Sequence, residues 1–151
     1  MKSNIYNKKS SARLFAVQIL FEMEINGKKI NNILERLTDD YLIEISRLNK
    51  VEKADKSHLI RILKGVTKNQ KEIDSYIKNN WIGWSLLRID SVSRSILRSA
   101  LYELKECSDI PVKVIINEYI EISKSFFEGE EPNFINGILD KISKIYRSSE
   151  L

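Results

Sequence analysis

The chain has 151 residues, of which 42% are hydrophobic and 30% charged, values typical of one globular domain with a single sizeable core. No run of about 18 apolar residues is available to span a membrane, and the N-terminus has no apolar stretch of signal-peptide length. Cys107 is the only cysteine, which excludes an internal disulfide and a cysteine-rich metal site and favours a cytoplasmic protein. Five glycines and two prolines are too few for a turn-dense sandwich or barrel, so we expect a mostly helical domain.

Positive charge is concentrated at the N-terminus. The sequence holds 25 Lys and Arg against 21 Asp and Glu, a net charge of +4. Lys2, Lys8, Lys9 and Arg13 all precede the first acid, Glu22, so the remaining 21 basic residues balance the 21 acidic ones. A neutral body with a basic arm suits a polyanion such as nucleic acid, although four cations at a chain end can equally serve solubility alone.

Helices are predicted wherever apolar residues recur at helical spacing. The first covers residues 10–26, with Ser10 or Ser11 as its N-cap and Gly27 as its C-cap. Two shorter helical segments are then expected, over residues 30–37 and 41–48.

A long helix is predicted next, capped by Asp55 or Ser57 and ending near Lys78. The segment 79–84 that follows contains two tryptophans and a glycine. We interpret it as a hinge between two helical halves rather than a flexible linker, because tryptophan usually buries. The expected halves therefore run to about residue 80 and over about 84–147.

The C-terminal half is predicted to hold three helices. Asp90 caps the first, and Pro111 at a first helical position begins the second. Residues 112–127 alternate apolar and polar side chains at their start as a strand does, but their length and overall spacing favour a helix. In the last helix we expect Gly137 to let a neighbour pack closely where a side chain is missing.

The sequence offers little catalytic chemistry. His58 is the only histidine, and because Lys56 and Arg61 flank it we expect it at the surface. Cys107 is expected near a helix C-terminus, where the helix dipole disfavours a thiolate, so a structural role is predicted. Carboxylate pairs such as Glu118 and Glu121 are typical of solvated helix faces, and no phosphate-loop or nucleophile motif is present. We therefore predict no enzyme, no cofactor and no metal site.

Four segments of the sequence resemble the NusB family of bacterial transcription antitermination factors. They are Ala12–Phe21, Ile96–Leu104, Asp109–Glu118 and Phe134–Lys141, in the family's order. The resemblance implies an all-α fold of about seven helices, in which two small bundles pack as one domain over residues 1–151. It also implies a non-enzymatic RNA-binding protein that binds boxA RNA together with the ribosomal protein NusE. The pair is delivered to the RNA polymerase antitermination complex, where it suppresses premature termination, notably in ribosomal RNA operons.

The resemblance also implies particular contact residues. The family's arginine-rich motif falls on residues 8–13, where serines 10 and 11 stand in place of arginines and lysine lacks the fork that grips phosphate through two bonds. For Phe126 and Phe134, a place in the core is the alternative to RNA contact. Phe21 and Ser93 lie where the family often has tyrosine and glutamate that contact NusE. The full set of implied RNA contacts is Lys8, Lys9, Arg13, Gln18, Arg98, Phe126, Glu130 and Phe134.

Two other functions are compatible with a helical chain of this kind. RNA cytosine methyltransferases carry a NusB-like domain followed by a catalytic domain with a nucleotide-binding loop and reactive cysteines, and because this sequence contains neither we expect a free-standing protein. A helical adaptor that binds protein alone is the second alternative. NusB-like proteins include monomers and homodimers, and the sequence leaves a homodimer possible.

Overall fold

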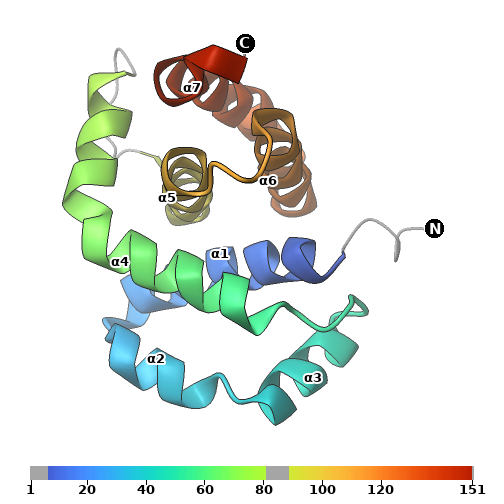
Figure 1. Ribbon diagram of the computed structural model, residues 1–151. Helices are drawn as coiled ribbons and strands as arrows, with labels where there is room; N and C mark the ends of the chain where they lie inside the picture. The colour runs from blue at the N-terminus through green and yellow to red at the C-terminus, as the bar shows by residue number, and fades with distance from the viewer. Residues whose placement is uncertain (1–6, 81–88, 151) are drawn as a thin grey trace. The chain divides into compact units, whose positions relative to one another are not determined.

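The computed structural model describes residues 7–80 and 89–150, and within these ranges it contains helices and no strands (Figure 1). The all-α prediction is therefore confirmed, including for the segment 112–127, where a strand was the alternative: it is helical to Phe126. The elements are α1 (Lys8–Asn26), α2 (Ile30–Arg36), α3 (Asp39–Leu48), α4 (Lys56–Asn79), α5 (Ser91–Glu106), α6 (Val112–Phe126), α7 (Glu131–Tyr146) and the short 3-10 helix η3 (Ser148–Glu150).

The chain forms two compact units, Met1–Thr67 and Lys68–Leu151. The division falls within α4, next to Asn69, whose φ of −110° and ψ of 17° interrupt the helical conformation. The tryptophans and glycine of the predicted hinge, residues 81–84, lie outside the described residues.

In the first unit, α1 begins two residues earlier than predicted. Its N-cap is Asn7, whose side-chain Oδ1 accepts a hydrogen bond from the Ser10 backbone N–H at 2.8 Å. The expected serine caps lie instead inside the first turn, because an Asx side chain reaches the N–H three residues on. Gly27 ends the helix in the left-handed conformation, with φ of 69°, as predicted.

The remaining elements of the first unit follow from local signals of the same kind. Thr38 caps α3 through a hydrogen bond from Tyr41 N–H, and Asp55 rather than Ser57 caps α4 through His58 N–H at 3.0 Å. Between α1 and α2, the Arg36 guanidinium donates to both carboxylate oxygens of Glu22 at 2.9 and 3.3 Å and lowers the pKa of that carboxyl. Side chains that are buried in this unit include Phe15, Ile33, Leu42, Leu59 and Ile62.

His58 is buried, so the predicted surface position is wrong. It shares a helix face with Ile62 and Val66, which are also buried, because residues four and eight positions apart lie on the same face of an α-helix. The charged neighbours Lys56 and Arg61 therefore did not predict which face of the helix carries the imidazole.

In the second unit, α5, α6 and α7 pack pairwise against one another. The C-terminal part of α4 joins them through side-chain contacts: Glu72 pairs with Lys105, and the rings of Tyr76 and Tyr146 lie 4.9 Å apart between centroids. Asp90 caps α5 as predicted, whereas Pro111 is the N-cap residue of α6 rather than its first helical residue.

Arg147 closes the C-terminal end of α5. Its guanidinium, which is buried, donates to the backbone carbonyls of Leu104 and Cys107, both at 2.7 Å, and of Ile110 at 3.0 Å. The last carbonyls of a helix have no partner within the helix, and Arg147 supplies a donor to that of Leu104. At Cys107 it adds a second bond, because that carbonyl also accepts from the Ile110 N–H at 2.9 Å. Val112 N–H and Arg147 together lower the pKa of the Glu150 carboxyl, which accepts from both.

We expect Arg147→Met to lower the free energy of unfolding by about 3 kcal/mol, because it removes charged hydrogen bonds and leaves buried carbonyls unsatisfied. Urea denaturation followed by circular dichroism measures the change. A loss below about 0.5 kcal/mol, the size of an ordinary surface substitution, would show that water replaces the guanidinium without cost.

Gly137 lies inside α7 as predicted, but no neighbour packs against it: a Cβ built there meets no atom within 4 Å. The prediction that a neighbouring residue packs closely against Gly137 is therefore wrong for the part of the chain that the structure describes. Glycine in a helix interior costs about 1 kcal/mol relative to alanine, and here no contact offsets that cost.

We expect Gly137→Ala to raise the free energy of unfolding by about 0.5–1 kcal/mol, because alanine is the better helix former and the space is open. Thermal denaturation of the two proteins in parallel tests this. A lower melting temperature for the alanine variant would contradict it.

Candidate RNA interface

Two of the N-terminal cations, Lys8 and Lys9, are held on a helix. Lys8 and Lys9 are the first two residues of α1 and are exposed. The Asn7 side chain caps this turn, and the Lys8 carbonyl accepts a hydrogen bond from the Asp55 backbone N–H at 3.0 Å. Both lysines therefore project from an anchored helix end, where their ammonium groups are available to phosphate. Lys2 lies outside the described residues.

The other polar residues of the same motif turn inward. Ser10 and Ser11 are buried, and the Ser10 hydroxyl donates to Asn7 Oδ1 at 3.0 Å. Arg13 is only 2% exposed, a position that does not suit direct contact with a phosphate in solvent. From Ser10 to Val17 every residue of α1 is buried, which explains why small serines fit at two of these positions. Gln18, the next residue, is half-buried.

Arg98 is committed to an ion pair with α4. Its Nε and Nη2 donate to the two carboxylate oxygens of Asp74 at 2.8 and 2.9 Å, and its side chain is 12% exposed. A bidentate pair of this geometry is among the stronger side-chain interactions. Arg98 therefore joins α4 to α5 through two of its five N–H groups.

The connection between α6 and α7 gathers three of the residues that the resemblance implies. Phe126, the last residue of α6, is 40% exposed, so the alternative of a core position does not hold for it. Glu130 is exposed and precedes α7, and its carbonyl accepts from the N–H of Phe134 at 3.0 Å. Phe134 is half-buried. An exposed aromatic ring can stack on a base, and an exposed carboxylate can accept hydrogen bonds from a base edge.

The two residues implied for NusE differ in their accessibility. Phe21 is half-buried on α1, so part of its ring faces solvent. Ser93 is fully buried: its Oγ and backbone N–H donate to the two carboxylate oxygens of Asp90, both at 2.8 Å. The Ser93 hydroxyl thus serves the α5 N-cap and is not offered to a partner.

The described residues contain no group of three or more His, Cys, Asp or Glu placed to hold a metal ion. None of the helices in that part of the chain has the length and apolarity needed to cross a membrane. Cys107 is buried at the C-cap of α5, in keeping with the structural role predicted for it.

Comparison with known proteins decides the family. The model of the NusB family matches residues 10–144. This chain belongs to the NusB family. The transcription antitermination protein NusB of Caulobacter vibrioides is 39% identical over 145 residues, which cover 95% of this chain and 97% of that protein. NusB of Bartonella quintana is also 39% identical and covers 93% of this chain and 91% of its own length.

Solved NusB structures share the fold. A structure of T. maritima NusB superimposes with a TM-score of 0.80 at 32% identity, covering 96% of this chain and 97% of that one. A structure of antitermination factors NusB and NusE in complex with dsRNA superimposes with a TM-score of 0.73 at 20% identity, covering 92% of this chain and 98% of that one. The second likeness supports the fold alone.

We expect Arg13→Ala to act on stability first, lowering the free energy of unfolding by about 2 kcal/mol or more, because a buried guanidinium contributes packing and its own interactions. Lys8→Ala and Lys9→Ala, which alter exposed side chains, should each stay within about 0.5 kcal/mol. Urea denaturation of the three variants distinguishes the two roles. If all three variants change the free energy of unfolding by the same small amount, Arg13 has no greater structural role than the exposed lysines.

Proposed function

We propose that this NusB-family chain is a non-enzymatic, cytoplasmic transcription antitermination factor. In this proposal it binds boxA RNA together with the ribosomal protein NusE, joins the RNA polymerase antitermination complex and promotes processive transcription of ribosomal RNA operons. The observation that carries the proposal is the match of the family model to residues 10–144. The exposed lysines at the start of α1 supply the charge that binding a nascent transcript requires.

In the proposed complex, charge and base recognition come from different elements. Lys8 and Lys9 neutralise phosphates of the RNA backbone, which positions the strand without reading its sequence. Phe126 and Phe134 stack on unpaired bases, and Glu130 accepts hydrogen bonds from base edges. Arg98, which is paired with Asp74 as described above, is a further RNA contact in this proposal.

For NusE, the accessible part of Phe21 provides an apolar contact on α1. Because the Ser93 hydroxyl is bound to Asp90 in the α5 cap, we propose that Ser93 holds this helix end in place for NusE and does not itself hydrogen-bond to it. The Phe21 ring lacks the hydroxyl of the tyrosine often present in the family, so we propose that the interface depends more on packing here.

The direct test is binding of a labelled boxA-like RNA to the full chain, with and without purified NusE, next to a scrambled RNA of equal length. We expect selective binding of the boxA-like RNA that becomes tighter when NusE is present. Equal binding of both RNAs would overturn the antitermination role, and binding of NusE without any RNA affinity would favour the protein-only adaptor. Sedimentation of the free chain separates a monomer from a homodimer in the same samples.

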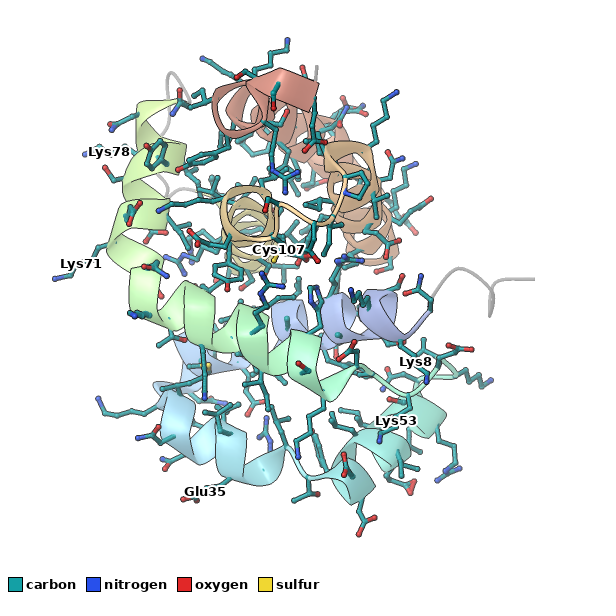
Figure 2. All side chains as sticks on the ribbon, viewed as in Figure 1. Lys8, Glu35, Lys53, Lys71, Lys78 and Cys107 are labelled. Atoms are coloured by element: carbon teal, nitrogen blue, oxygen red, sulfur yellow. The ribbon has the colours of Figure 1, made fainter. Side chains whose placement is uncertain are left out.

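We expect the double variant Lys8→Ala/Lys9→Ala to bind more weakly and with a shallower salt dependence. Each phosphate contact on single-stranded RNA contributes about 0.7 to the slope of log K against log salt, so the slope should fall by about 1.4. Lys71→Ala/Lys78→Ala is the matched control, because these lysines are exposed and project outward from α4 (Figure 2). An unchanged slope for the first variant, or an equal loss for both, would remove Lys8 and Lys9 from the interface.

A further inference from the structure

The loop between α3 and α4 lies against the start of α1. The Asp55 backbone N–H donates to the Lys8 carbonyl at 3.0 Å, and the ribbon of the loop runs beside the N-terminal end of α1 (Figure 1). Lys53 stands two residues before Asp55 and is exposed, on the same side as Lys8 in Figure 2. A segment some 45 residues away in sequence therefore brings an additional cation next to the lysines proposed to contact RNA.

The ammonium group of Lys53 is loosely held in the structure. Its Nζ lies 3.5 Å from Oδ1 of Asp39, the first residue of α3, and the two side chains are 44% and 67% exposed. Exposed ion pairs of this length contribute little, because water and salt screen the charges and holding two side chains together costs conformational entropy. A phosphate that approaches Lys8 can therefore take the place of the Asp39 carboxylate.

The loop carries a second lysine, Lys50, together with two acids, Glu52 and Asp55. Lys50 is exposed and has a left-handed backbone conformation, with φ of 57°, where glycine or asparagine is less strained. Of the two acids in the loop, Asp55 is occupied in the α4 cap through His58 N–H at 3.0 Å, and Glu52 is exposed.

We propose that Lys53 and Lys50 extend the surface formed by Lys8 and Lys9 into one contact for the RNA backbone, and that Asp39 competes with RNA for Lys53. This inference rests on the proposed RNA-binding function and assigns it a second segment of the chain. Asp39 acts as an internal anion that occupies Lys53 in the free protein, so RNA binding exchanges one ion pair for another. The competition lowers affinity for every RNA equally, since a phosphate contact carries no sequence information.

The proposal predicts changes of opposite sign for the two members of the pair. Lys53→Ala should reduce the slope of log K against log salt by about 0.7 and weaken boxA-like and scrambled RNA by the same factor. Asp39→Asn should strengthen binding by up to about fivefold, the factor that corresponds to the upper end of an exposed ion pair. In the double variant Asp39→Asn/Lys53→Ala, the gain from Asp39→Asn should disappear.

Matched variants separate these effects from net charge. Asp40→Asn removes an exposed acid next to Asp39 that no ion pair connects to Lys53 in the described structure, and Lys71→Ala removes an exposed lysine of α4. The inference is overturned if Asp40→Asn raises affinity as much as Asp39→Asn, if Lys71→Ala weakens binding as much as Lys53→Ala, or if the double variant keeps the gain. Circular dichroism of each variant confirms that the altered surface residues leave the fold intact.

The same titrations distinguish failure of this inference from failure of the proposed function. If the unaltered chain binds boxA-like RNA selectively and responds to Lys8→Ala/Lys9→Ala, but not to changes at Lys53 and Asp39, the RNA surface ends at α1 and the inference alone is wrong. If the unaltered chain binds no RNA with NusE present, both fall together.

Discussion

Each helix leaves backbone N–H groups at its start and carbonyls at its end without partners inside the helix, and this protein satisfies several of them with particular polar side chains. Asn7, Asp55 and Asp90 accept from the first turns of α1, α4 and α5. Arg147 donates to the carbonyls that end α5. The positions of the elements depend on these contacts, because a buried helix end without partners costs about as much as a core substitution.

The same contacts decide which polar residues remain available to a ligand. The hydroxyls of Ser10 and Ser93 hydrogen-bond to capping side chains, so neither is presented to RNA or to NusE. Lys8 and Lys9 stand at the outer side of a capped turn and stay exposed. The motif that the sequence presents as one basic arm therefore has an exposed part, Lys8 and Lys9, and a buried part from Ser10 onward, both within α1.

The two units, considered separately, carry different kinds of chemistry. The first holds exposed lysines at the start of α1 and in the α3–α4 loop, groups that attract any nucleic acid through its phosphates. The second holds Phe126, Glu130 and Phe134 at the α6–α7 connection, the residue types that read unpaired bases. Affinity and selectivity are thus expected to respond to substitutions in different units, which makes the proposed function accessible to separate tests.

Sequence by itself determined the helical class, the order of the helices, and caps such as Gly27 and Asp90, because these follow from residues within one or two turns of each other. The resemblance of four segments was enough to identify the NusB family, and with it the residues to inspect. Periodicity did not predict the burial of Arg13 and His58 or the open space at Gly137. A helical pattern indicates a face, whereas burial depends on what other elements place against that face.

Tertiary structure alone decided the contacts between distant segments. Arg147 meets carbonyls 37 to 44 residues earlier in the chain, and the α3–α4 loop reaches Lys8 through a backbone N–H that any residue but proline could supply. Backbone donors and acceptors are alike at every position, so no side-chain pattern predicts which of them will pair across the fold. The ion pair between Asp39 and Lys53 also depends on tertiary structure, because the fold brings two side chains together that are 14 residues apart in the sequence.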